Sequence, residues 1–202
     1  MTRGVLLVLL CAALLAGCGR GTPPVARLGA TDVVVAFGDS LTYGTGAKPE
    51  ESYPAVLGQL INRTVVRAGV PGEQTAGGLA RLPGVLDEHQ PRLVIVCLGG
   101  NDMLRKGART QIEANLREIL KTIKSRGLDA VLVGVPAPGL ITSAPEFYEK
   151  LAHEFRIPYE GEVVTSVLYR SELKSDPIHP NAAGYRKMAE AVAQLLRTAG
   201  AF

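Results

Sequence analysis

The sequence predicts a three-layer α/β/α sandwich with a central, mostly parallel β-sheet, and three observations support this fold class. Short, continuous apolar runs rich in β-branched residues alternate along the chain with longer amphipathic segments. The apolar runs lack the period-two alternation of a half-exposed strand, so they are typical of strands that are covered on both faces. The composition, with 47% hydrophobic and 20% charged residues, is that of an ordinary globular protein.

Four apolar runs are expected to form the central strands of the sheet. They cover residues 33–37, 65–68, 93–98 and 130–135. Because such strands are joined by right-handed crossovers, they run in the same direction and their carboxyl ends share one edge of the sheet. Ligands of open α/β sheets bind at that edge, so the residues that follow each run are the candidates for chemistry.

Six amphipathic segments are expected to form the helices that cover the sheet. They are residues 53–61, 74–89, 110–125, 146–155, 162–172 and 182–198. In 110–125 the apolar positions follow helical spacing, and Gly127 comes after them as a stop signal. The last helix repeats this pattern, and Asn181 stands before it as an N-cap.

The start of the chain has the pattern of an export signal. Arg3 precedes an apolar run from Val5 to Ala16, which is short for a membrane span but suits the h-region of a signal peptide. The run ends in Leu-Ala-Gly-Cys at 15–18, which resembles a bacterial lipobox, and ordinary cleavage after a small residue is the alternative. We therefore expect lipidation of Cys18.

The domain organisation follows from this start. We expect a lipoprotein signal peptide over 1–17, a flexible tether over 18–30 and a single folded domain over 31–202. Acyl chains at Cys18 would hold the protein in the bacterial cell envelope, facing the periplasm or the exterior, without a transmembrane helix. The formal net charge of +3 gives no support for a nucleic-acid partner, and we expect a monomer.

Glycine-rich or polar motifs occupy the positions where chemistry is expected. Three of them follow strands, and the fourth precedes the last helix: Gly38-Asp39-Ser40-Leu41, Gly69-Val70-Pro71-Gly72, Gly99-Gly100-Asn101-Asp102 and Asp176-Pro177-Ile178-His179-Pro180. A serine at a strand end can be a nucleophile, an asparagine amide can donate to an oxyanion, and a proline-stiffened loop can aim a histidine inward. Each motif alone has the equally ordinary interpretation of a turn.

In this order, GDSL at 38–41, Gly72, GGND at 99–102 and DPIHP at 176–180 resemble the sequence blocks of the GDSL, or SGNH, hydrolase family. The similarity extends over essentially the whole domain and is nearest to the exported acyl-thioesterases, arylesterases and lysophospholipases. The resemblance implies a flavodoxin-like SGNH-hydrolase fold. It also implies a serine esterase that cleaves aryl or acyl esters, thioesters or lysophospholipids and needs neither a metal nor another cofactor.

The resemblance also implies roles for five residues. Ser40 is the expected nucleophile, His179 the general base and Asp176 the residue that orients the histidine. The backbone N–H groups of Ser40 and Gly72 and the side-chain amide of Asn101 are the expected oxyanion-hole donors.

Three further residues adjoin the expected site residues in the sequence. Pro177 departs from the family pattern, because many relatives carry a smaller or polar residue at this position. Asp39 and Asp102 adjoin turn residues, and we expect each to tie its own loop by hydrogen bonds.

The sequence says less about the substrate than about the type of reaction. Leu104, Leu140 and Ile141 lie in the loops after the third and fourth strands and are candidates to line an acyl groove, with packing against the core as an equal alternative. A carbohydrate acetylesterase acting on envelope or extracellular polysaccharide would use the same triad, and a non-catalytic surface lipoprotein would keep only the fold. The absence of tryptophan and the 5% aromatic content favour lipid-like or aryl esters over sugars.

Overall fold

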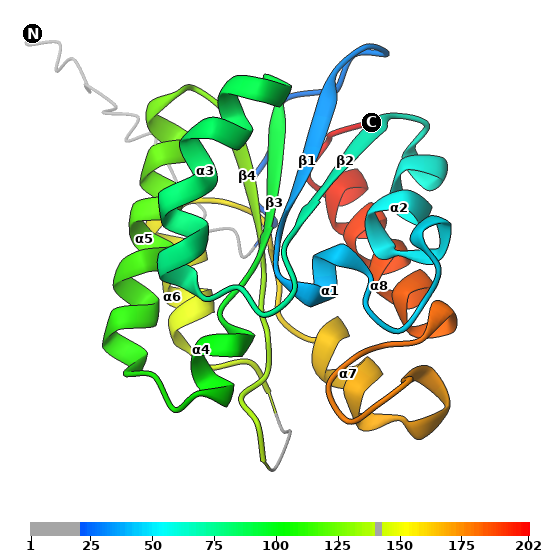
Figure 1. The fold of residues 1–202 in the computed structure, drawn as a ribbon. Coiled ribbons are helices and arrows are strands. Elements are labelled where there is room, and N and C mark those ends of the chain that lie inside the picture. The colour runs from blue at the N-terminus through cyan, green and yellow to red at the C-terminus, as the bar shows by residue number, and fades with distance from the viewer. Residues whose placement is uncertain (1–20, 140–142) are drawn as a thin grey trace, which may run out of the picture.

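A computed structural model describes residues 21–139 and 143–202. Its centre is a five-stranded sheet of order β2-β1-β3-β4-β5 in which every neighbouring pair is parallel (Figure 1). The strands are β1 (Val33–Gly38), β2 (Thr64–Gly69), β3 (Leu93–Cys97), β4 (Asp129–Val133) and β5 (Tyr159–Glu160). The predicted three-layer fold is confirmed.

Helices cover both faces of this sheet (Figure 1). On one face lie α2 (Tyr53–Ile61), α7 (Val163–Tyr169) and α8 (Ala182–Thr198), and on the other α3 (Thr75–His89), α5 (Arg109–Ser125) and α6 (Phe147–Phe155). Two short helices, α1 (Ser40–Tyr43) and α4 (Gly100–Leu104), follow β1 and β3 directly. Both therefore lie at the carboxyl edge of the sheet, which is the lower edge in Figure 1.

The predicted elements differ from the observed ones at their ends. The predicted strand over 130–135 ends at Val133, and the predicted helix over 162–172 ends at Tyr169, where the chain continues into a 3₁₀ turn at Ser171–Leu173. The edge strand β5 was not predicted, because two residues make no apolar run.

The core lies on both faces of the central strands. All five residues of β3 are buried, and Val34 to Gly38 of β1 are buried as well, as their continuous apolar pattern predicts. On the two helical faces the sheet packs against residues such as Leu57 of α2 and Leu116 of α5, neither of which is exposed at all. Full burial of such a side chain contributes about 1.5–3 kcal/mol.

In the described part of the segment before β1, residues 25–28 are attached to the domain, which differs from the flexible tether expected over 18–30. Leu28 is only 2% exposed, and its backbone N–H donates to the carbonyl of Ala201 at 2.8 Å. The N–H of Ala26 donates to the side chain of Asp129, the first residue of β4, at 2.9 Å. The chain is thus attached to the domain near the amino ends of the strands before β1 begins.

Two predictions about the N-terminus lie outside the described residues. These are the signal peptide over 1–17 and the lipidation of Cys18. Within the described ranges, no helix has both the length and the apolar character needed to cross a bilayer.

The register of the sheet decides which loops can meet. Gly38 at the end of β1 pairs with Gly69 of β2 on one side and with Cys97 of β3 on the other. The segments that leave these three strands therefore begin at the same level. At Gly38 a side chain is excluded, because a Cβ there would overlap the carbonyl oxygen of Cys97 and the hydroxyl of Thr42.

Candidate active site

Ser40 begins helix α1 directly after the end of β1. The preceding residue, Asp39, caps this helix, because its Oδ1 accepts a hydrogen bond from the backbone N–H of Leu41 at 3.0 Å. Gly44 ends the helix in the left-handed conformation, with φ of 90°. A strand, a capped turn of helix and a glycine stop thus hold the serine at the sheet edge.

His179 and Asp176 reach this serine from the loop before α8. His179 Nε2 lies 3.0 Å from Ser40 Oγ, and His179 Nδ1 lies 2.7 Å from Asp176 Oδ2. The three side chains therefore form one continuous chain of hydrogen bonds, although the serine and the histidine are 139 positions apart. The fold thus brings together the three residues that the sequence predicts as a triad.

The loop that carries the histidine is fixed by its own hydrogen bonds. Asp176 Oδ1 accepts from the backbone N–H groups of Ile178 and His179 at 2.8 and 2.9 Å. Pro177 has no N–H to donate, but this turn uses only the two donors that follow it, so the unusual proline fits the loop. Asn181 then caps α8 through the N–H of Gly184 at 3.1 Å.

The carboxylate of Asp176 is stabilised in its ionised form. Desolvation acts to raise its pKa, but the hydrogen bonds from the His179 ring and from the N–H groups of Ile178 and His179 outweigh it, so the pKa lies below its ordinary value. Asp176 therefore stays ionised at any pH at which a histidine acts as a base.

Gly72 lies in a tight turn between β2 and α3. Pro71 and Gly72 are the central residues of this turn, which the N–H of Glu73 closes by donating to the carbonyl of Val70 at 3.1 Å. Gly72 has φ of 78°, which the second central position of a type II turn requires and which favours glycine. The N–H of Gly72 belongs to the peptide between these two central residues and is not the donor that closes the turn.

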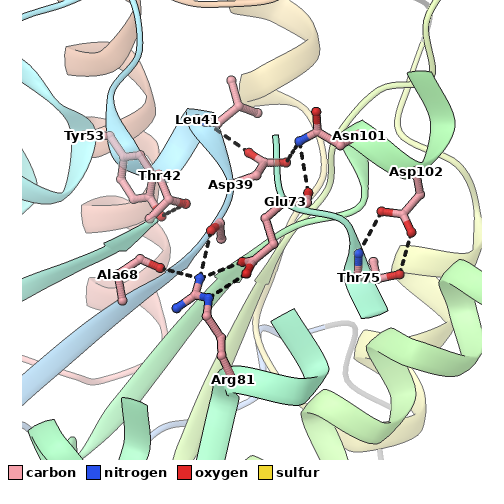
Figure 2. A network of polar contacts seen from close by, with 11 residues as sticks. Asp39, Leu41, Thr42, Tyr53, Ala68, Glu73, Thr75, Arg81, Asn101 and Asp102 are labelled. Carbon is pink, nitrogen blue, oxygen red and sulfur yellow. Dashed lines mark hydrogen bonds and ion pairs between the residues drawn. The ribbon is translucent and has the colours of Figure 1, made fainter. Parts of the chain in front are cut away.

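Asn101, near the start of α4, is held by two acceptors. Its Nδ2 donates to Asp39 Oδ2 at 3.2 Å and to the backbone carbonyl of Glu73 at 3.0 Å (Figure 2). The amide is thus placed between the end of β1 and the turn that contains Gly72. Neither partner could be predicted from the sequence pattern.

The prediction that the Asp102 side chain ties its own loop is wrong. Its carboxylate binds the start of α3 instead. Its carboxylate accepts from the backbone N–H of Thr75 at 2.9 Å and from the hydroxyl of the same residue at 2.7 Å (Figure 2). Asp102 is only 6% exposed, and a buried carboxylate is tolerated when such donors satisfy it. Its contacts clamp α4 to the segment that follows Gly72.

Comparisons with known proteins identify the family of this chain. Residues 36–187 match the model of the GDSL-like lipase/acylhydrolase family, and this range includes all four motifs. The chain belongs to this family. It is a carboxylic-ester hydrolase.

Relatives of this GDSL-like hydrolase carry esterase names. The thioesterase 1/protease 1/lysophospholipase L1 of Escherichia coli (strain K12) is 34% identical over 179 residues, which are 85% of this chain and 86% of that protein. The arylesterase of Vibrio mimicus is 32% identical over 178 residues, or 83% of this chain and 89% of the other. The crystal structure of AlinE4, an SGNH-hydrolase family esterase, matches with a TM-score of 0.65 and 33% identity over 85% of this chain and 97% of that one.

A cavity of the GDSL-like hydrolase opens beside the serine. It has a volume of about 60 Å³ and is lined by Ser40, His179 and Asn101 together with mainly apolar side chains. Those are Leu41, Leu104, Val135, Pro136, Ala137, Pro138, Leu168, Pro177 and Ile178. A wall of this kind suits the acyl or aryl part of an ester.

The structure places one of the three proposed substrate-binding residues in this wall. Leu104 lines the cavity and is 42% exposed, whereas Leu140 and Ile141 lie outside the described residues. Leu168 of α7 also lines the cavity and was not predicted, because an apolar residue on an amphipathic helix resembles a core residue. The described residues hold no cluster of three or more His, Cys, Asp or Glu side chains suited to a metal ion.

Asp39 is almost fully buried beneath the site, at 2% exposure. Burial raises its pKa from 3.8 to about 7, and the hydrogen bonds from Leu41 and Asn101 only partly offset this effect. Since folded Asp39 holds its proton more tightly than the unfolded chain does, the folded protein loses stability as pH rises from about 4 to about 7.

Replacement of Asp39 by asparagine is expected to remove this dependence on pH. The melting temperature of the wild type, relative to that of Asp39→Asn, should fall by about 5 °C or more between about pH 4.5 and about pH 8. Thermal unfolding at a series of pH values measures it. A difference that stays constant across the series would show that the carboxyl group ionises freely in the folded state.

Proposed function

We propose that this esterase acts by nucleophilic catalysis, with Ser40 as nucleophile, His179 as general base and Asp176 as the residue that orients the histidine. The observation that carries the proposal is the chain of hydrogen bonds from Asp176 through His179 to Ser40 at the mouth of an apolar cavity. A neutral serine hydroxyl is a poor nucleophile, so a base within hydrogen-bond reach is the first requirement.

The hydrogen-bond partners decide which nitrogen of the neutral His179 ring carries the proton. Asp176 accepts from Nδ1–H, so the neutral ring keeps its free lone pair on Nε2, facing Ser40. Nε2 then takes the hydroxyl proton while Oγ attacks the carbonyl carbon of the ester. The proton passes to the leaving alcohol or thiol, and Asp176 stabilises the imidazolium that forms in between.

The second half of the reaction uses the same groups. A water molecule gives its proton to His179 and attacks the acyl group on Ser40. The tetrahedral intermediate collapses, the proton returns to Oγ, and the carboxylic acid leaves.

The negative oxygen of each tetrahedral intermediate needs donors, and we assign the N–H groups of Ser40 and Gly72 and the amide of Asn101. In the free protein the Asn101 amide already donates to Asp39 and to Glu73. Its contact to Asp39 is the longer one, at 3.2 Å, and Asp39 lines the cavity. We therefore expect the oxyanion to share or replace this contact.

The variant Asn101→Ala is expected to lower kcat by about two to three orders of magnitude, because it removes one oxyanion donor. KM should change little, since the donor acts mainly in the transition state. Steady-state hydrolysis of a p-nitrophenyl ester measures both constants. An unchanged kcat in a folded variant would remove Asn101 from the mechanism.

We propose acyl and aryl esters, including thioesters and lysophospholipids, as substrates. The apolar cavity wall supports this class, and the printed names of the relatives include thioesterase, lysophospholipase and arylesterase. Hydrolysis of p-nitrophenyl esters of increasing chain length, followed by an acyl thioester, tests it. A preference for acetylated sugars over every acyl chain would favour the carbohydrate acetylesterase, and no Ser40-dependent hydrolysis at all would favour a scaffold.

We further propose that the protein is exported and anchored to the cell envelope by acyl chains at Cys18. The apolar run before this cysteine and the lipobox-like Leu-Ala-Gly-Cys at 15–18 support the proposal. Metabolic labelling with a fatty acid tests it, because the label should appear in the wild type and be absent from Cys18→Ala. Label that survives the substitution would refute the anchor.

A further inference from the structure

Arg81 of α3 turns inward beneath the candidate active site instead of facing solvent. Its Nε and Nη2 donate to the two carboxylate oxygens of Glu73, both at 2.7 Å. Nη2 also contacts the strand-end carbonyls of Ala68 at 2.9 Å and Gly38 at 3.2 Å, and the guanidinium lies 4.2 Å from the centre of the Phe37 ring. The side chains of Arg81 and Glu73 are only 25% and 8% exposed.

This ion pair touches each segment that supplies an expected oxyanion donor. Gly38 leads to Ser40, and its carbonyl accepts from both Arg81 and the N–H of Val70. Glu73 closes the turn that holds Gly72. The carbonyl of the same glutamate accepts from the amide of Asn101 (Figure 2). The pair thus contacts Asn101 directly and lies within two residues, along the chain, of Ser40 and of Gly72.

The chemistry of the pair suits a fixed arrangement. A guanidinium presents several donors in a rigid plane, so it can bind a carboxylate with two bonds and still reach neighbouring carbonyl oxygens, which a lysine ammonium does less well. Burying two charges is costly, and an apolar pair of similar volume is often at least as stable. Stability alone therefore does not explain why this pair lies under the serine.

We propose that Arg81, through Glu73, is a positioning residue that holds the oxyanion hole in its reactive geometry. The proposal rests on the serine-hydrolase function proposed above. Arg81 touches no substrate atom. It fixes the distance between the end of β1, the turn with Gly72 and the amide of Asn101, and displacement of a donor by about 1 Å can cost about 100-fold in rate.

The first test is the variant Arg81→Met, which keeps most of the side-chain volume. We expect kcat to fall about 10- to 100-fold while KM stays within about threefold, because the donors act in the transition state. Arg81→Lys should retain more of the activity. Since Arg81→Met leaves Glu73 buried without a partner, the double variant Glu73→Gln/Arg81→Met, which removes both charges, provides a second route to a folded protein.

The control is an arginine of a more exposed ion-pair network that does not line the cavity. Arg117 of α5 contacts Glu154 through Nε at 3.0 Å and Glu113 through Nη2 at 2.7 Å, and it does not contribute to the cavity. Arg117→Met should leave kcat and KM unchanged. An equal loss of kcat in this control and in Arg81→Met would overturn the proposal, because it would show a general effect of removing an ion pair.

A double-mutant cycle separates positioning from simple destabilisation. If Arg81 acts through the oxyanion hole, Arg81→Met should lower kcat by a clearly smaller factor in the Asn101→Ala background than in the wild-type background, because one of the three donors that Arg81 positions is already absent. Losses that multiply would overturn the proposal, as would a wild-type kcat in both Arg81→Met and Glu73→Gln/Arg81→Met. A wild type without Ser40-dependent hydrolysis would refute the proposed function itself. A wild type that is active, with Arg81 variants of normal kcat, would refute only the role of Arg81.

Discussion

Replacing Ser40 by alanine is expected to lower kcat for ester hydrolysis by at least about 10⁴-fold. Without Oγ there is no acyl-enzyme, and His179 Nε2 loses the hydroxyl that lies 3.0 Å away. A small residual rate above that in water is expected, because the oxyanion donors can still bind a substrate that water attacks directly.

The measurement is steady-state hydrolysis of a p-nitrophenyl ester, together with labelling by a reactive alkyl phosphonate. Mass spectrometry of the intact protein should show one added phosphonyl group on the wild type and none on Ser40→Ala. Ser125→Ala is the matched control, since Ser125 is exposed at the end of α5 and its hydroxyl donates to the carbonyl of Thr122. Retention of more than about 1% of the wild-type kcat by Ser40→Ala would exclude this serine as nucleophile.

The variant Asp176→Asn is expected to lower kcat by about 10³- to 10⁴-fold. Asparagine can still accept from the N–H groups of Ile178 and His179 through its oxygen, so the loop should keep its shape. The amide nitrogen then faces His179 Nδ1 and donates to it, which favours the tautomer with the proton on Nε2. That tautomer cannot accept the proton of Ser40.

In Asp176→Asn, steady-state kinetics should therefore show a large loss of kcat, whereas thermal unfolding should show a melting temperature close to that of the wild type. Asp87→Asn is the matched control, because Asp87 is an exposed carboxylate paired with Arg126 away from the cavity. A kcat within about tenfold of the wild type in Asp176→Asn would mean that the carboxylate does not orient the histidine.

The central fold could be predicted from the sequence because its signals are local. Continuous β-branched runs mark β1, β2, β3 and β4, and amphipathic spacing marks α5 and α8. The same reasoning missed β5, which has only two residues, and the packing of Leu28, an isolated apolar residue without periodicity. Tertiary contacts decide both features.

The candidate site could be predicted only in part. Four ordered motifs were enough to name Ser40, Asp176 and His179, which the structure brings into hydrogen-bond distance. The contacts that support the site could not be predicted in the same way. Arg81 lies within a helix that reads as amphipathic, and nothing in its local sequence indicates that its side chain points toward the ends of β1 and β2.

The position of the chain ends has a practical consequence for handling this protein. Leu28 pairs with Ala201, so both ends enter the domain at the edge of the sheet where the strands begin, whereas Ser40 lies where they finish. A strand of six residues spans about 20 Å, which separates the two edges. A fusion partner, an affinity tag or a bead attached at the carboxyl terminus would therefore leave the catalytic edge turned outward, free to meet esters arriving from bulk solution.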